Sequence, residues 1–163
     1  MSEIRVKILD FCTDFSIVFI MKMLKLDDID SKPLSELPFI PLFVYGTLRL
    51  GGSLHHLIAP HILEQVDNVY IFGRLHSSTQ GLWPVVRAGG DEKVHGSLFA
   101  LEIDLEVMAS IFKEELLFGY DLAWNQIYES DGNEYSKALV CTWETDEFVG
   151  DKISHGDWLK HLS

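Results

Sequence analysis

The sequence has little cysteine, little positive charge and no long apolar run, and each shortage narrows what the protein can be. Only two of its 163 residues are cysteines, Cys12 and Cys141, which lie far apart and form no CxxC pattern. Disulfide scaffolds and zinc knuckles need more cysteines at closer spacing, so we expect neither. Unpaired thiols fit a reducing compartment, and we expect a cytoplasmic protein.

The shortage of basic residues bears on the partners of the protein. Lys and Arg number 13 against 25 Asp and Glu, which gives a formal net charge of −12 at pH 7. Nucleic acids and anionic membranes are bound by clustered basic faces, so we expect neither as a partner. An anionic ligand would have to be held locally, by a shaped pocket that works against the overall negative charge.

The N-terminal part of the chain differs in composition from the rest. Its apolar run, Phe15–Met21, is far shorter than the about 20 residues that cross a bilayer, and it lacks the charge order of a signal peptide. Residues 27–38 are acidic and contain proline and serine, as linkers do. We expect residues 1–38 to be an accessory arm and linker, and residues 39–163 to form one globular domain.

Motifs for metals, nucleotides and serine hydrolysis are missing. His55, His56 and His61 precede Glu64, but their spacing is not H-E-x-x-H and places no three ligands on one helix face. The glycines between residues 46 and 52 match neither a Walker loop nor a dinucleotide fingerprint, and no G-x-S-x-G elbow occurs. We therefore expect neither a metal nor a cofactor, and not a serine hydrolase.

Apolar spacing and turn residues predict short strands with two interposed helices. Ser53 is a candidate N-cap for a first helix that carries Leu54, Leu57, Ile58 and Ile62. A second helix is expected over residues 105–117. Strands are predicted at residues 39–45, 68–75, 82–86 and 94–101, and as a hairpin of 125–128 with 136–143. This order predicts an α+β fold with a mixed, strongly curved sheet or small barrel and flanking helices.

The stretch Tyr45-Gly46-Thr47-Leu48 begins at the last residue of the first predicted strand, and the pair Gly51-Gly52 comes soon after it. A strand that turns toward a helix leaves backbone N–H groups unpaired. Such groups can hold a carboxylate or an oxyanion without any charged side chain. We interpret this stretch as a ligand-holding turn.

Three more segments follow this turn in order: Gly81–Val86, Val94–Phe99 and Ser154–Trp158. Over residues 40–160 the series resembles the γ-glutamyl cyclotransferase-like (AIG2-like) family. Its members share a Y-G-T/S-L loop, a Y/W-P-hydrophobic segment, a V-x-G-E-L-Y-like strand and often a terminal G-D-W. The resemblance implies a mixed α+β barrel, in agreement with the fold class expected from the pattern of elements.

The resemblance also implies a chemistry. In the family the loop, here Tyr45, Gly46, Thr47 and Leu48, holds the glutamyl end of a small γ-glutamyl substrate. The α-amine of the substrate attacks its own side-chain carbonyl, so that only the folded-back conformer must be held, and 5-oxoproline and a free amine are released. One carboxylate whose pKa is raised toward neutral would take the proton. No metal or cofactor is required.

The catalytic glutamate is where this chain departs from the family pattern. Members read L-D-x-x-E-G at the end of the second helix, and residues 111–120 do not match this text. An ungapped alignment puts Glu115 at the position of the base, whereas alignment of Gly119 with the family glycine puts Phe118 there. We favour Glu115, which lies on the helix side with the apolar stripe, although Glu114 and Glu115 could also be a solvated helix end.

Tyr120 is a candidate wall of the substrate pocket, and an aromatic at such a place can equally belong to the core. The departure at the L-D-x-x-E-G segment motivates a second hypothesis for the whole protein. In that case the chain is a catalytically inactive member of the fold that binds a small ligand or a partner protein.

Overall fold

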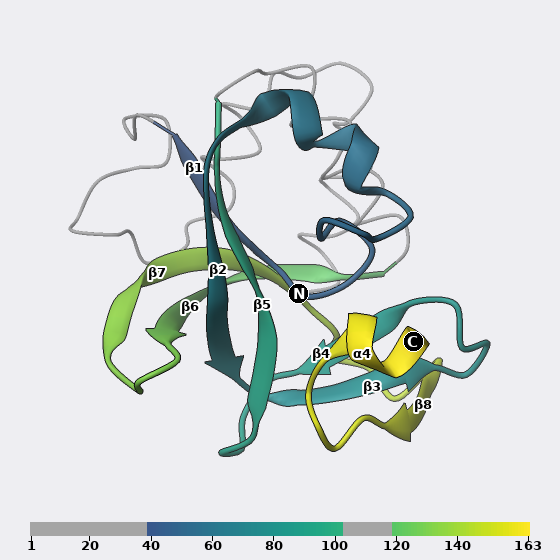
Figure 1. Cartoon of the computed structure of the whole chain (residues 1–163). Coiled ribbons are helices and arrows are strands. Elements are labelled where there is room, and N and C mark those ends of the chain that lie inside the picture. The colour runs from purple at the N-terminus through teal and green to yellow at the C-terminus, as the bar shows by residue number, and fades with distance from the viewer. Residues whose placement is uncertain (1–38, 103–118) are drawn as a thin grey trace.

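The computed structural model describes residues 39–102 and 119–163, and in this part of the chain five strands close into a barrel (Figure 1). The strand order around the barrel is β1-β5-β2-β6-β7. The bounds are Ile40–Val44 for β1, Ile62–Phe72 for β2, Lys93–Leu101 for β5, Asp121–Glu129 for β6 and Glu134–Thr142 for β7. Neighbouring strands are antiparallel except β1 and β7, which run parallel and close the barrel where Leu42 faces Leu139.

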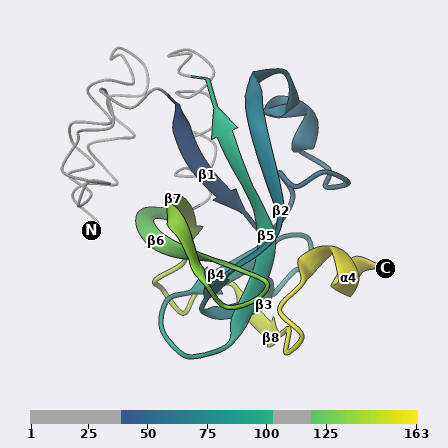
Figure 2. The same cartoon turned by 60° about the vertical axis from the view of Figure 1, so that its left-hand side comes forward.

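A second sheet of three strands lies at one end of the barrel (Figure 2). It has the order β4-β3-β8, with β3 at Arg74–Ser78, β4 at Pro84–Arg87 and β8 at Val149–Lys152. The short helix α4, Trp158–Leu162, follows this sheet. Two 3-10 helices, η2 at His55–Leu57 and η3 at Ala59–His61, lie between β1 and β2. The expected mixed, strongly curved α+β fold is confirmed, with few helices in the described residues.

The main apolar cluster fills the barrel with side chains from all five of its strands. They are joined by Trp158 of α4, which is 1% exposed. The members from the barrel strands are Phe43, Val69, Ile71, Val94, Leu98, Ile127, Ala138 and Val140. Successive residues of a strand face opposite sides, and Leu42 and Phe99, next to Phe43 and Leu98, are buried too. β1 and β5 are therefore covered on both faces, which explains the continuous apolar run of β1.

The predicted first helix is wrong. Ser53 caps no helix, the chain forms only the short turns η2 and η3, and Ile62 is the first residue of β2. Pro60 stands at the start of η3, where its ring removes a backbone donor and prevents an α-helix from continuing through it. The apolar residues at helical spacing therefore belong to two different kinds of element.

The other strand predictions are mostly confirmed. The hairpin around Asp131-Gly132-Asn133 is formed by β6 and β7, and β5 covers the strand expected at 94–101. The strand expected at 68–75 is divided, because Gly73 separates the long β2 from β3. The helix expected at 105–117 and the accessory arm 1–38 lie outside the described residues. In the described ranges, the helices are all too short or too polar to span a bilayer.

Gly96 allows β1 and β5 to lie in close contact. A Cβ at this position would lie 2.2 Å from the carbonyl oxygen of Val44 and 2.6 Å from Cζ of Phe43. Both distances are below any ordinary contact, and one of the opposing atoms is backbone. The absence of a side chain here lets the ring of Phe43 pack over β5.

We predict that Gly96→Val destabilises the fold by about 3 kcal/mol, the upper part of the range for overpacking a core. Valine has the higher intrinsic preference for strands, so propensity alone predicts the opposite sign. Urea unfolding measures the difference. Lys137→Val, at an exposed position of β7, is the control and should change stability by no more than about 0.5 kcal/mol. Equal stability of Gly96→Val and the wild type would contradict the close packing.

Candidate functional site

The turn after β1 presents its backbone to a small cavity. Arg49 donates its N–H to the Gly46 carbonyl at 3.0 Å, and Leu54 donates to Thr47 at 2.9 Å, which together fix the curvature of the turn. In the described part of the chain, the N–H groups of Gly46, Thr47 and Leu48 donate no hydrogen bond. Unpaired N–H groups on a turn are the kind of site that holds a carboxylate or an oxyanion.

Gly46 has no room for a side chain. A Cβ there would lie 2.5 Å from Cγ of Pro84, the first residue of β4. The turn and the start of β4 are therefore in direct contact, although they are far apart in sequence. The Y-G-T-L and W-P segments, which are separate in the sequence, are therefore neighbours in space.

Tyr45 anchors the turn to β7, the strand beside β1 where the barrel closes. Its ring is 5% exposed and belongs to the main apolar cluster. Its hydroxyl donates a hydrogen bond of 2.5 Å to the carbonyl of Cys141 in β7. This long-range bond fixes the position at which the turn begins.

Tyr120 lines the same cavity from another direction. Its hydroxyl donates to the carbonyl of Pro84, and its ring meets Trp143 edge to face at 5.2 Å between centroids. The residue is 7% exposed and belongs to a second apolar cluster with Val85 and Trp143. Tyr120 is therefore both a core aromatic and a wall of the cavity, so the two interpretations from sequence are compatible.

The cavity has a volume of about 40 Å³. It is lined by residues 42–48, Pro84, Tyr120 and Cys141, so it brings together Tyr45, Gly46, Thr47, Leu48 and Tyr120. A single water occupies about 30 Å³ in the liquid, so a larger ligand needs the cavity to widen. Glu115, Glu114 and Phe118 lie outside the described residues.

Arg49, at the end of the turn, pairs with Asp157 near the C-terminus. Nη1 of Arg49 lies 2.9 Å from Oδ1 of Asp157. The same carboxylate oxygen is the N-cap of α4, because it accepts the N–H groups of Leu159 at 3.1 Å and Lys160 at 3.3 Å. A cap and an ion pair in one side chain fasten the C-terminal helix to the turn.

The G-D-W segment is held against β5 as well. Gly156 has a φ of 70°, and its carbonyl accepts the N–H of His95 at 2.8 Å. A Cβ on Gly156 would lie 1.9 Å from the Lys93 carbonyl oxygen, so the position requires glycine. The two motifs at residues 94–99 and 154–158 are thus in contact. Sequence reasoning missed the Arg49–Asp157 pair, for which the only signal was opposite charge at the edges of two motifs.

Burial and neighbouring groups shift the pKa values of Asp157 and of the nearby His95. Burial acts to raise the pKa of Asp157, but the Lys160 N–H and the Arg49 guanidinium outweigh it, so the pKa lies below its usual value. Burial lowers the pKa of the nearby His95, against the opposing effect of Asp157. The lowered pKa values keep the Asp157 carboxyl in its charged form and favour the neutral form of His95 at neutral pH. Among the described residues, no group of three His, Cys, Asp or Glu side chains could hold a metal ion.

The protein belongs to the class of small mixed barrels in which the first strand ends in a turn with open backbone donors. Comparison with known proteins identifies its family. The model of the family "Gamma-glutamyl cyclotransferase, AIG2-like" matches residues 42–160. The chain belongs to this family. Comparison with curated proteins gave no match.

Solved structures share the fold. An uncharacterized protein from Pyrococcus horikoshii is 25% identical with a TM-score of 0.55, over 76% of this chain and 96% of that one. YkqA from Bacillus subtilis is also 25% identical with a TM-score of 0.55, over 76% of this chain and 41% of YkqA. An AIG2-like protein from Mus musculus is 18% identical with a TM-score of 0.53, over 75% of this chain and 89% of that one.

We predict that Asp157→Asn lowers the stability at pH 7 by about 0.5–1 kcal/mol, because the pair with Arg49 is partly exposed and screened by solvent. Asparagine retains the cap and removes only the charge. The folded pKa of Asp157 is lowered, so its contribution is present above the unfolded pKa of about 3.9 and is lost as the pH falls through the folded pKa.

The difference between wild type and Asp157→Asn should accordingly shrink below about pH 4. Urea unfolding at several pH values measures it, with Asp151→Asn as a control at an exposed position of β8. A difference that is independent of pH would show that the charge of Asp157 does not stabilise the fold.

Proposed function

We propose that the protein is a γ-glutamyl cyclotransferase that acts on a γ-glutamyl amine or peptide and releases 5-oxoproline and a free amine. The observation that carries this proposal is the set of open N–H donors of Gly46, Thr47 and Leu48 in the turn characteristic of the family. These donors would hold the carboxylate end of the glutamyl group. Tyr120 and Pro84 would form the opposite wall of the widened cavity.

The reaction needs one base and a held conformer. The α-amine of the substrate forms a C–N bond to its own side-chain carbonyl carbon, and the C–N bond to the leaving amine breaks. Glu115 would relay the two protons that the attacking nitrogen loses, one before the attack and one as it becomes the lactam N–H. Both would pass to the leaving nitrogen, which departs as an ammonium, so that no net proton is consumed. Tethering of the nucleophile supplies much of the acceleration, and no cofactor is needed. The few cysteines favour a cytoplasmic location.

The role of Glu115 is tested by Glu115→Gln. We expect the rate of 5-oxoproline release from a panel of γ-glutamyl amines and peptides to fall about 10²–10⁴-fold, the usual contribution of general base catalysis. Glu114→Gln is the matched control, since it removes the neighbouring charge, and it should retain most of the activity. Full activity of Glu115→Gln would refute its role as the base.

The same panel separates the two functions considered for this chain. If the wild type releases no 5-oxoproline from any compound, while glutamate or 5-oxoproline raises its melting temperature, the protein is an inactive binding member of the family. Turnover of at least one compound by the wild type supports the enzyme.

Gly46→Ala tests the turn. The added methyl would overlap Pro84, so the turn must move by an ångström or so, and a displacement of this size can lower kcat/KM about 10²-fold. Leu50→Ala, at a side chain that is 64% exposed in the same loop, is the control. Steady-state kinetics and the melting temperature of both variants measure the effect. Unchanged kcat/KM in Gly46→Ala would show that the geometry of the turn is not used.

A further inference from the structure

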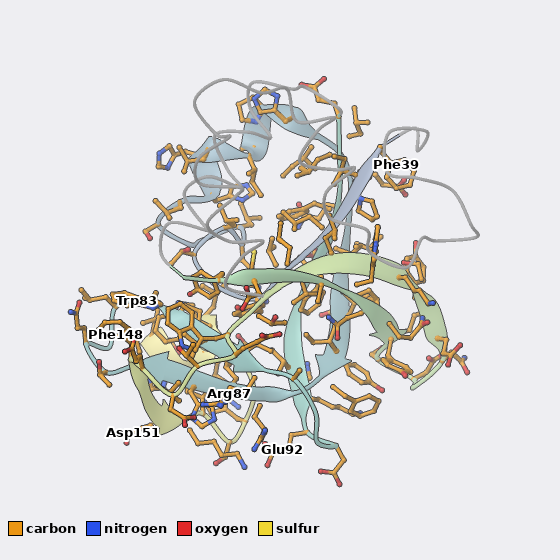
Figure 3. The ribbon with its side chains drawn as sticks, turned by 180° about the vertical axis from the view of Figure 1, so that it is seen from behind. Phe39, Trp83, Arg87, Glu92, Phe148 and Asp151 are labelled. Carbon is orange, nitrogen blue, oxygen red and sulfur yellow. The ribbon has the colours of Figure 1, made fainter. Side chains whose placement is uncertain are left out.

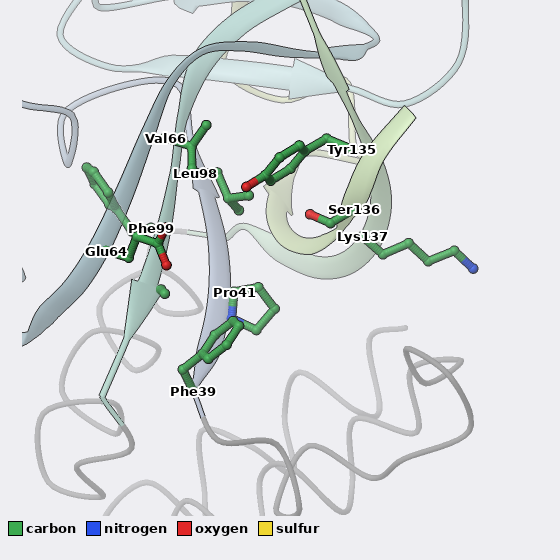
Figure 4. Close-up of a pocket in the computed structure, with 10 residues that line it drawn as sticks. Phe39, Pro41, Glu64, Val66, Leu98, Phe99, Tyr135, Ser136 and Lys137 are labelled. Atoms are coloured by element: carbon green, nitrogen blue, oxygen red, sulfur yellow. The ribbon is translucent and has the colours of Figure 1, made fainter. Parts of the chain in front are cut away.

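A second, larger cavity lies at the other end of β1 from the turn (Figure 4). Its walls come from the chain just before and at the start of β1, the beginning of β2, the end of β5 and the beginning of β7. Among the residues that the structure describes, none lines both this cavity and the cavity at the turn. Figure 3 shows Phe39, which lines this cavity, and Trp83, the residue before Pro84, on opposite sides of the view.

The size of this cavity suits a small molecule. Its volume is about 360 Å³, within the about 300–1,000 Å³ that is usual for ligand sites. The wall is largely apolar: Pro41, Val66 and Leu98 line it, and Leu98 is only 7% exposed. Phe39, which also lines the cavity, is 39% exposed. A ligand with an apolar body would cover this surface.

Three polar side chains lie around the apolar wall: Glu64 and Tyr135, which are exposed, and the half-buried Ser136. In Figure 4 the carboxylate of Glu64 and the hydroxyls of Tyr135 and Ser136 face the space between β2 and β7. None of these three side chains makes a hydrogen bond or ion pair within residues 39–102 and 119–163. Lys137, the one basic residue that this part of the chain contributes to the lining, extends away from the cavity in the same view.

The charged groups around the cavity indicate which sign of charge a ligand should carry. The carboxylate of Glu64 can accept an N–H group of a primary ammonium, and a hydroxyl of the lining is a further acceptor. An anion would be repelled by Glu64 and by the net charge of −12. A neutral ligand would gain no charge-assisted hydrogen bond from Glu64, which is exposed to solvent. The cavity therefore matches a cation with an apolar body.

We propose that this cavity is a binding site for a small primary amine with an apolar body, in which Glu64 pairs with the ammonium and Pro41, Val66 and Leu98 contact the apolar part. The site is separate from the turn at Tyr45–Leu48, so the proposal does not depend on the cyclotransferase reaction.

Isothermal titration calorimetry of the full chain with phenethylamine tests the site. 2-Phenylethanol and 3-phenylpropanoate serve as neutral and anionic probes with a similar apolar body. Phenethylamine should bind at least about tenfold more tightly than either, as expected when a charge-assisted hydrogen bond is present. Glu64→Gln should weaken phenethylamine binding about tenfold and leave 2-phenylethanol unaffected. Tyr135→Phe should weaken it less, because the ring is retained.

Glu147→Gln is the matched control, because it removes the same charge at an exposed position that lines neither cavity, and it should leave binding unchanged. Amide chemical shifts locate the probe: phenethylamine should move the signals of residues 64–66, 98–100 and 135–137. Equal affinity in wild type and Glu64→Gln would overturn the proposal. So would equal affinity for the alcohol and the amine, or shifts confined to residues 44–48.

Discussion

The structure depends on the way the turn after β1 is fastened from three directions. The hydroxyl of Tyr45 reaches the Cys141 carbonyl in β7, Gly46 packs on Pro84 of β4, and Arg49 pairs with Asp157 at the start of α4. Each partner is distant in sequence, so the turn takes its shape only when the barrel, the second sheet and the C-terminus are all in place. A turn held in this way keeps its N–H groups oriented before any ligand arrives, which is the condition for electrostatic stabilisation without reorganisation.

This fastening explains why the sequence motifs occur as a set. The W-P segment supplies the proline against Gly46, and the G-D-W segment supplies the partner of Arg49 and the buried Trp158. Gly96 in the third segment allows β1, which leads into the turn, to lie close to β5. Most of the segments that resemble the family therefore pack against the turn after β1 or hold it in position.

The sequence predicted the parts of the fold that local rules decide. The strands β1 and β5 follow from apolar runs, and the β6–β7 hairpin follows from Asp131-Gly132-Asn133 and the strand pattern on each side. It failed at Ser53–Ile62, where an apolar stripe at helical spacing was divided between 3-10 turns and a strand by Pro60 and by pairing with β5. The parallel contact of Leu42 with Leu139 and the Arg49–Asp157 pair are long-range, and no local pattern encodes them.

The residues expected at the site, Tyr45 to Leu48 and Tyr120, do surround one cavity. The cavity at Glu64 is formed by four separate segments of the chain, so no sequence motif marks it.

The proposed function requires that the backbone of the turn hold the carboxylate end of a glutamyl group. A crystal structure of the protein with 5-oxoproline tests it most directly. We predict that the carboxylate lies about 2.7–3.2 Å from the backbone nitrogens of at least two of Gly46, Thr47 and Leu48, the distance of an N–H···O hydrogen bond. Binding of 5-oxoproline at any other place, with these N–H groups left open, would contradict this role of the turn.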